Sequence, residues 1–251
     1  MSTPLAILTG AASGIGHAVA QHLSKTHTLV LIDRAEIPAQ PEGEKLQVDV
    51  SSLTDWKKVS GAIKGRPIDF VLLNAGIGPN PSWTDVEGWH TLMNTNMFGV
   101  VNGIATLLPH IENTKATVVI TGSKQGITNP PGNPAYNASK AALKIIAENL
   151  SYSLRSSQVS VHLLVPGYTY TGLTKQSSSK PDAAWTAEQV SDYLFKKLEH
   201  KQFYVICPDN AVTTEMDNKR MLWNVKDITE GRPALSRWRE EYEQEFASYM
   251  K

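Results

Sequence analysis

The stretch Thr9–Leu23, "TGAASGIGHAVAQHL", decides the fold of this chain. It follows the apolar run "LAIL" at 5–8 and carries Gly10, Gly14 and Gly16 where a helical pattern begins. Gly10 permits a sharp reversal that a Cβ would obstruct. Gly14 and Gly16 let the backbone approach a pyrophosphate, whose negative charge is favoured by the N–H groups and dipole of a helix start. We therefore predict a dinucleotide-binding turn between the first strand and the first helix.

The rest of the chain alternates short apolar runs with longer stretches of helical periodicity. Helical stretches cover 15–25 and 136–155, among others, and the apolar runs lie at 5–8, 28–33, 45–50, 69–73, 117–121, 159–165 and 203–207. Strands separated by helices form a parallel sheet covered on both faces, and near-continuous apolar strands suit that burial. We predict an α/β fold, a Rossmann-like doubly wound parallel sheet of about seven strands.

The organisation predicted is one domain over 1–251, with a core at 1–207 and a C-terminal helical extension at 208–251. The extension places four aromatic residues at steps of four, four and three, which is typical of one packed stripe on a helix: Trp238, Tyr242, Phe246 and Tyr249. The segment 174–182, "TKQSSSKPD", is interpreted as a mobile loop.

Composition excludes several classes of function. The 251 residues hold 24 Lys plus Arg against 24 Asp plus Glu, so no net basic charge favours a nucleic acid or an anionic membrane surface. The only cysteine, Cys207, allows no internal disulfide, and with no adjoining basic residue it is not expected to be a catalytic thiol. The seven His residues show no ligand spacing, so no metal site is expected. No basic segment precedes the first apolar run, and a cytoplasmic location is expected.

An acidic residue follows the glycine turn at the distance that dinucleotide binding requires. Asp33 ends the second apolar run, 23 residues beyond Gly10, where a carboxylate accepts hydrogen bonds from the adenosine ribose. The same charge repels the 2′-phosphate of NADP. Arg34 could instead turn toward that phosphate, but Ser13 offers no second basic group. We therefore predict NAD over NADP; the alternative is a solvated Asp–Arg pair at the end of a strand.

Taken together, these motifs resemble the short-chain dehydrogenase/reductase family. The resemblance covers residues 5–171 in the family's order, and its departures are minor, with "LNAG" for a double Asn and "TGS" for a double Ser. The matching features are TGxxxGxG at Thr9–Gly16, "NAG" at Asn74–Gly76, "NMFG" at Asn96–Gly99, Ser123, "YNASK" at Tyr136–Lys140 and "PGYTYT" at Pro166–Thr171.

The resemblance implies four catalytic residues: Ser123, Tyr136, Lys140 and Asn96. Tyr136 would be the acid/base, and Lys140, four residues on, would favour its phenolate and hold the nicotinamide ribose. Lowering the Tyr136 pKa by about three units requires roughly 4 kcal/mol of differential stabilisation, which Lys140 and a bound oxidised nicotinamide, two nearby cations, could supply. Ser123 would orient the substrate oxygen, and Asn96 would hold a water that links Lys140 to solvent.

The resemblance also implies the cofactor contacts. Thr171, with the backbone near Pro166, would fix the nicotinamide carboxamide, Asp49 would meet the adenine, and Asn74 would shape the adenosine side. Alternatives remain open: Asn96 and Asn74 could be structural, and Thr171 could cap a helix. The full predicted set is Gly10, Ser13, Gly14, Ile15, Gly16, Asp33, Arg34, Asp49, Val50, Asn74, Ala75, Gly76, Tyr136, Lys140, Pro166, Gly167, Thr169 and Thr171.

The implied function is reversible hydride transfer between an alcohol or carbonyl carbon and a nicotinamide cofactor. A non-catalytic dinucleotide-binding regulator is the alternative; a nucleotide-sugar epimerase or dehydratase is disfavoured because its TGxxGxxG turn is not present. A homodimer or homotetramer built on the helices of Asn96 and Tyr136 is expected by resemblance. The substrate, a small alcohol or carbonyl compound, is expected to meet Ile77, Trp83, Lys124, Gln125, Asn129, Tyr168 and the loop 174–185.

Overall fold

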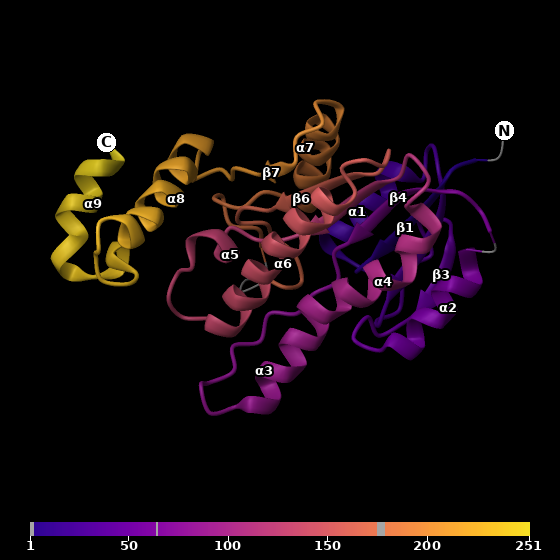
Figure 1. Ribbon diagram of the computed structural model, residues 1–251, viewed down its shortest axis with the longest axis horizontal. Coiled ribbons are helices and arrows are strands. Elements are labelled where there is room, and N and C mark those ends of the chain that lie inside the picture. Colours follow the sequence, from indigo (N-terminus) through magenta and orange to yellow (C-terminus); the bar gives the residue numbers. More distant parts are fainter. Residues whose placement is uncertain (1–2, 64, 175–178) are drawn as a thin grey trace.

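A computed structural model describes residues 3–63, 65–174 and 179–251. Within this part of the chain, seven parallel strands form one sheet in the order β3-β2-β1-β4-β5-β6-β7 (Figure 1). The order reverses between β1 and β4, and such a switch point leaves a crevice at the carboxyl ends of the strands. The bounds are β1 Leu5–Thr9, β2 Thr28–Asp33, β3 Glu44–Gln47, β4 Ile68–Leu73, β5 Thr117–Thr121, β6 Ser160–Val165 and β7 Tyr204–Ile206.

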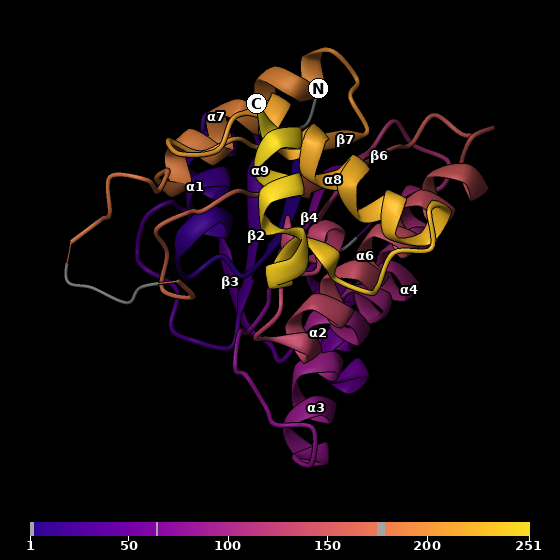
Figure 2. The same cartoon turned by 90° about the vertical axis from the view of Figure 1, so that its left-hand side faces the viewer.

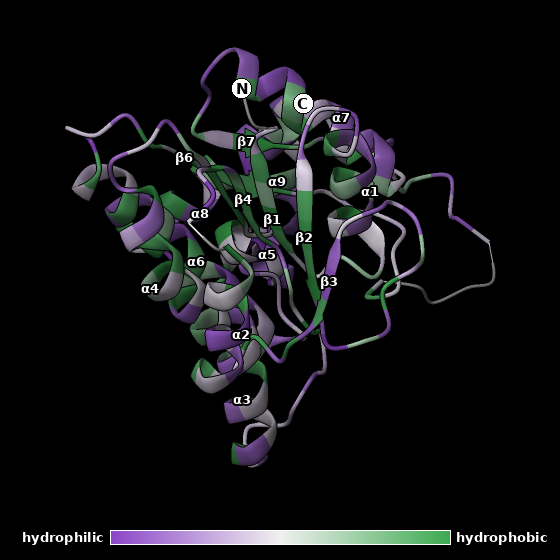
Figure 3. Ribbon diagram, turned by 90° about the vertical axis from the view of Figure 1, so that its right-hand side faces the viewer, coloured by the Kyte–Doolittle hydropathy of each residue, from purple (hydrophilic) through white to green (hydrophobic). Residues whose placement is uncertain are grey.

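Helices cover both faces of this sheet, so its central strands are buried from two sides, whereas the edge strand β3 is mostly exposed (Figures 2 and 3). Successive residues of β1 enter different cores: Leu5 and Ile7 pack on one face, and Ala6 and Leu8 pack on the other. One face carries α1 (Gly14–Leu23) and α7 (Ala187–Glu199). The other carries α2 (Leu53–Ile63), α4 (Gly99–Ile111) and α6 (Pro134–Ser153). The predicted doubly wound α/β fold of about seven strands is therefore confirmed.

The helix that carries Asn96 contains a local widening. α3 (Val86–Met93) runs into a π-helical turn, η1 (Asn94–Phe98), and then into α4. Gly99 closes the turn by donating its N–H to the carbonyl of Asn94, five residues back. Turns of this kind occur frequently at functional sites, and here the turn contains Asn96, whose side chain is fully buried.

The C-terminal extension differs from its prediction. It contains α8 (Thr214–Thr229), the 3₁₀ turns η2 (Ser236–Trp238) and η3 (Glu240–Tyr242), and α9 (Glu243–Met250), at one end of the molecule in Figure 1. The expectation of one helix bearing all four aromatic residues is wrong, because Arg239 has extended backbone angles and interrupts the helical spacing. Phe246 and Tyr249 nevertheless pack their rings 5.1 and 5.2 Å from that of Trp223 in α8.

None of the helices in the described part of the chain combines the length and the apolar character needed to cross a bilayer. Of the loop at 174–182, positions 175–178 lie outside the described residues, so its predicted mobility stays a prediction.

Candidate active site

A cavity of about 850 Å³ lies at the carboxyl ends of the strands. Every residue of the predicted catalytic and cofactor-binding sets lines it except Gly16 and Asn96. Ile77, Lys124, Gln125 and Tyr168 of the expected substrate side line it as well. Trp83 and Asn129 do not: Trp83 is 76% exposed and stacks on Trp89, with 5.3 Å between their rings.

The glycine turn forms one wall of this cavity. Gly10 and Gly14 have φ angles of +71° and +56°, in the left-handed region that glycine adopts with less strain than any other residue. Gly16 lies behind the wall, where an added Cβ would come within 2.0 Å of the carbonyl oxygen of Gly10. The side chain of Ser13 makes no capping hydrogen bond to the first turn of α1. The N–H groups of that turn thus remain available to an anion in the cavity.

The end of β2 is joined to the same turn through a carboxylate. Asp33 accepts hydrogen bonds from the N–H groups of Ala12 (3.0 Å) and Ala35 (2.9 Å), so its carboxylate is fixed beside the turn. Arg34 is exposed and lines the cavity next to it. Asp49 lies further along the wall, where its Oδ1 accepts from the N–H and the hydroxyl of Ser51.

Thr9 connects the ends of the two central strands. Its hydroxyl accepts from the N–H groups of Asn74 (2.9 Å) and Ala75 (3.1 Å), and the Asn74 amide donates to the Thr9 carbonyl at 3.3 Å. Asn74 thus makes a structural contact between strands while it also lines the cavity.

Tyr136 lies in the first turn of α6 because two residues define where that helix begins. Asn133 caps it, with Oδ1 accepting from the N–H of Tyr136 at 3.2 Å, and Pro134 follows at a position that suits proline. The side-chain hydroxyls of Tyr136 and Ser123 lie next to each other. Lys140 follows one turn later, with Nζ 5.7 Å from the centroid of the Tyr136 ring and 2.9 Å from the Thr121 carbonyl that it bonds. The structure therefore brings Ser123, Tyr136 and Lys140 together.

Burial shifts the pKa values of Tyr136 and Lys140. It raises the pKa of the Tyr136 hydroxyl, and the hydrogen bond from Ser123 opposes this to a smaller extent. Without a cofactor, desolvation of the phenolate dominates this pKa. The expected lowering by Lys140 together with a bound oxidised nicotinamide stays a prediction. Burial also lowers the pKa of Lys140 to about 8.

The lowered pKa of Lys140 predicts a dependence of stability on pH. Below pH 8 the folded chain carries the buried charge at a cost; between about pH 8 and 10.5 only the unfolded chain binds this proton, so stability rises with pH. Lys140→Met removes the titration. We expect its unfolding free energy, relative to wild type, to fall by about 3 kcal/mol across that window. Urea unfolding at several pH values measures the difference; a difference that stays constant would contradict the buried charge.

Asn96 supports the cavity from behind. Its Oδ1 accepts from the N–H of Ile77 at 2.8 Å, and its Nδ2 donates to the Ile77 carbonyl (2.9 Å) and to the hydroxyl of Ser139 (3.1 Å). These bonds hold the loop after β4 against α6. Its role in a water relay stays a prediction.

Several lining residues were missed by the sequence reasoning. Thr121 and Gly122 directly precede Ser123, and Thr95 directly precedes Asn96, so adjacency to a motif could have found them. Asn133 could have been found as the cap residue before Pro134. Val48 and Gly172 likewise adjoin Asp49 and Thr171, whereas Gly78 and Leu173 adjoin only segments expected on the substrate side. Cys207 is fully buried, and burial raises the pKa of its thiol to about 12, as suits an unreactive side chain.

The geometry fits a dinucleotide. One end of the cavity offers positive-φ glycines and uncapped helix N–H groups for a pyrophosphate, with Asp33 beside them. A Cβ at Gly14 would come within 3.1 Å of Thr171 on the opposite wall, so glycine keeps the passage between the walls open. The other end holds the side chains of Ser123, Tyr136 and Lys140.

Comparison with known proteins places this geometry in context. The family model described as short chain dehydrogenase matches residues 4–182. A sulfoacetaldehyde reductase of Chromohalobacter salexigens is 32% identical over 220 residues, covering 77% of this chain and 87% of the relative. The oxidoreductase asL5 of Sarocladium schorii is 27% identical over 197 residues, covering 73% and 79%.

Solved structures show the same fold. A short-chain dehydrogenase/reductase from Burkholderia phymatum in complex with NAD superposes with a TM-score of 0.78 at 24% identity, over 93% of this chain and 98% of the other. A short-chain dehydrogenase from Sphingobium yanoikuyae in complex with NADPH has a TM-score of 0.74 at 20% identity, over 95% and 100%. Structures of this fold thus include complexes with either dinucleotide.

Proposed function

Because the chain belongs to the short-chain dehydrogenase family of oxidoreductases, we propose that it interconverts an alcohol and a ketone or aldehyde with Tyr136 as acid and base. The observation that carries the proposal is that Ser123 and Tyr136 lie side by side at one end of the cavity, with Lys140 one turn behind Tyr136. The nicotinamide, when bound, supplies or accepts the hydride. The residues of the predicted cofactor set that line the cavity, from Gly10 to Thr171, would hold it.

The roles of the three side chains follow from their positions. Ser123 would hold the substrate oxygen beside the Tyr136 hydroxyl, because the two hydroxyls lie next to each other. With its pKa raised by burial, Tyr136 keeps its proton at neutral pH, as the acid of carbonyl reduction must. Lys140 bonds the Thr121 carbonyl, which holds its ammonium beneath the Tyr136 ring.

A substrate screen tests the proposal against its alternative. The purified chain is mixed with a panel of ketones and aldehydes plus NADH or NADPH, and of alcohols plus the oxidised forms, while absorbance of the reduced cofactor is followed. The relative named sulfoacetaldehyde reductase makes small aldehydes a first choice. Turnover supports the enzyme. Binding of a dinucleotide without turnover of any compound would favour the non-catalytic regulator.

We propose NAD as the preferred cofactor, since the Asp33 carboxylate is fixed beside the turn where a 2′-phosphate would have to lie. Asp33→Asn keeps the shape and removes the charge while leaving Arg34 in place. We expect the ratio of kcat/KM with NADH to that with NADPH to fall by about tenfold or more, as one charge contact of roughly 1.4 kcal/mol would give. Wild type favouring NADPH, or an unchanged ratio in the variant, would contradict the assignment.

A homodimer or homotetramer in the cytoplasm completes the proposal. The helices that the resemblance assigns to subunit contacts, α4 and α6, expose the apolar side chains of Val101, Ile145 and Tyr152. Sedimentation velocity would test this, and a monomer at micromolar concentration would argue against it.

A further inference from the structure

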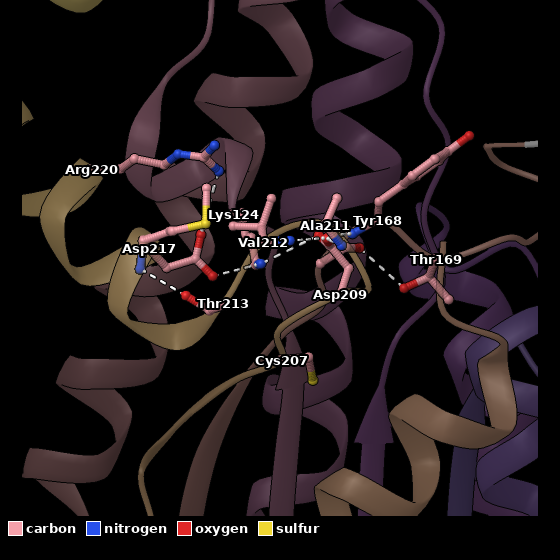
Figure 4. A network of polar contacts seen from close by, with 12 residues as sticks. Lys124, Tyr168, Thr169, Cys207, Asp209, Ala211, Val212, Thr213, Asp217 and Arg220 are labelled. Carbon is pink, nitrogen blue, oxygen red and sulfur yellow. Dashed lines mark hydrogen bonds and ion pairs between the residues drawn. The ribbon is translucent and has the colours of Figure 1, made fainter. Parts of the chain in front are cut away.

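A cluster of charged side chains joins the segment after Ser123 to the C-terminal extension (Figure 4). Lys124 places Nζ 2.6 Å from a carboxylate oxygen of Asp217 in α8 and 3.5 Å from one of Asp209. The side chains of Asp217 and Asp209 are only 4% and 5% exposed, and that of Lys124 is 16% exposed. Arg220 lies at the edge, with Nη1 3.9 Å from the other oxygen of Asp217. Because Lys124 also lines the cavity, the cluster borders the proposed active site.

Asp209 links this cluster to a second wall of the cavity. Its Oδ2 accepts the N–H of Tyr168 at 3.1 Å, and its Oδ1 accepts those of Ala211 (3.0 Å) and Val212 (2.7 Å), as Figure 4 shows. The contact is close, since a Cβ on Gly167 would come within 2.9 Å of the same Oδ2. The loop after β6 therefore lies directly on the start of the extension.

The short helix after Ser123 is held by α8 at both ends. Lys124 is the cap residue of α5 (Gln125–Thr128), and the Ser123 hydroxyl accepts from the N–H of Gln125 at 3.2 Å. At the other end, Asn224 of α8 donates to the Thr128 carbonyl at 2.8 Å. α6 also packs closely against α5: a Cβ added to Gly126 would lie 2.4 Å from the backbone carbonyl carbon of Lys140. That packing fixes the middle of α5, whereas the ion cluster fixes the end that carries Ser123.

We propose that the Lys124–Asp209–Asp217 cluster positions Ser123 and the backbone of Tyr168, so that the C-terminal extension forms part of the active site. Lys124 is then a positioning residue, not a free cation of the substrate pocket. The inference rests on the proposed function. It adds Asp209 and Asp217, which lie beyond residue 182, where the family match ends. A displacement of about 1 Å at a reacting group can reduce turnover by 10²-fold, so a contact of this kind can control the rate.

Asp217→Asn tests the inference, because it keeps the side-chain shape and removes one of the two charges that hold Lys124. We expect kcat to fall about tenfold or more and the dinucleotide Kd to change less, because the loop after β6 supplies only part of the predicted cofactor set and the glycine turn and Asp33 supply much of the rest. Lys124→Met is expected to lose at least as much. Lys124→Arg, which restores the charge, is expected to stay within about threefold of wild type in kcat. The matched control is Glu215→Gln on the same helix, a 79% exposed residue paired with Lys219, with no expected change.

Hydrogen exchange gives a readout that needs no turnover. Amides of residues 122–129 and 167–170 are expected to exchange faster in Asp217→Asn than in wild type or Glu215→Gln. Should Asp217→Asn not fold, Lys124→Gln carries the same expectations. Wild-type kcat in both Asp217→Asn and Lys124→Met would overturn the inference, whatever the exchange rates show. If wild type turns over no substrate, the proposed function fails. In that case faster exchange at 122–129 and 167–170 in Asp217→Asn would still support the coupling of these loops to the cluster, and unchanged exchange would overturn that coupling.

Discussion

Tyr136→Phe is expected to lower kcat by about 10²–10⁴-fold while leaving dinucleotide binding nearly unchanged. The substitution removes one oxygen, the atom that lies beside the Ser123 hydroxyl and that would exchange a proton with the substrate. The ring itself, below which Lys140 lies, stays in place. Steady-state kinetics with the best substrate of the screen measure the first effect, and NADH fluorescence titration measures the second.

The control for this variant is a tyrosine that hydrogen-bonds elsewhere. The hydroxyl of Tyr204, in β7, donates to Glu148 on the surface and does not line the cavity. Tyr204→Phe should therefore keep wild-type kcat. A Tyr136→Phe enzyme with unchanged kcat would remove the proposed mechanism, and equal losses in both variants would indicate a general effect on the fold.

Gly16→Ala is expected to cause the second large effect, on the cofactor end of the site. The added Cβ would lie 2.0 Å from the carbonyl oxygen of Gly10 and 2.9 Å from the Asn74 amide, so α1 must move away from the turn. Overpacking of this kind costs about 1–3 kcal/mol or more. Because the displaced backbone is the one that would face the pyrophosphate, we expect dinucleotide affinity to fall by about tenfold or more.

Gly61→Ala separates the close contact from the general effect of replacing a helical glycine. Gly61 lies within α2, and a Cβ there would meet nothing within 4 Å. We expect this variant to gain about 0.5–1 kcal/mol in unfolding free energy and to bind dinucleotide as wild type does. Calorimetry or urea unfolding and NADH titration measure both variants. Wild-type dinucleotide affinity in Gly16→Ala would show that the turn does not hold the cofactor.

Local sequence was sufficient for most of the fold and for the central part of the site. The alternation of apolar runs and helical periods predicted all seven strands, because each pattern reports how its own segment is buried. The glycine turn was likewise predictable from its local context. The spacing of Tyr136 and Lys140 is common on helices, so their role was predicted through the family resemblance. Arg239 marks the limit of this approach, because nothing in the aromatic spacing revealed the break there.

The electrostatic character of the site depended on contacts between segments that are distant in sequence. The pKa of Tyr136 is raised because burial of the phenolate depends on every element packed around the cavity, whereas the sequence suggested only its neighbour Lys140. Asn96 bonds the loop after β4, and Lys124 pairs with Asp209 and Asp217, which no motif connects to it.

The sequence by itself determined the order of strands and helices along the chain and the glycine turn, because each of these depends on residues a few positions apart. Ser123, Tyr136 and Lys140 were identified in it through the family resemblance. Only the tertiary structure decided how deeply those groups are buried and which charges from the C-terminal extension meet them. Desolvation and ion pairing act through space, so they depend on packing that local spacing does not encode.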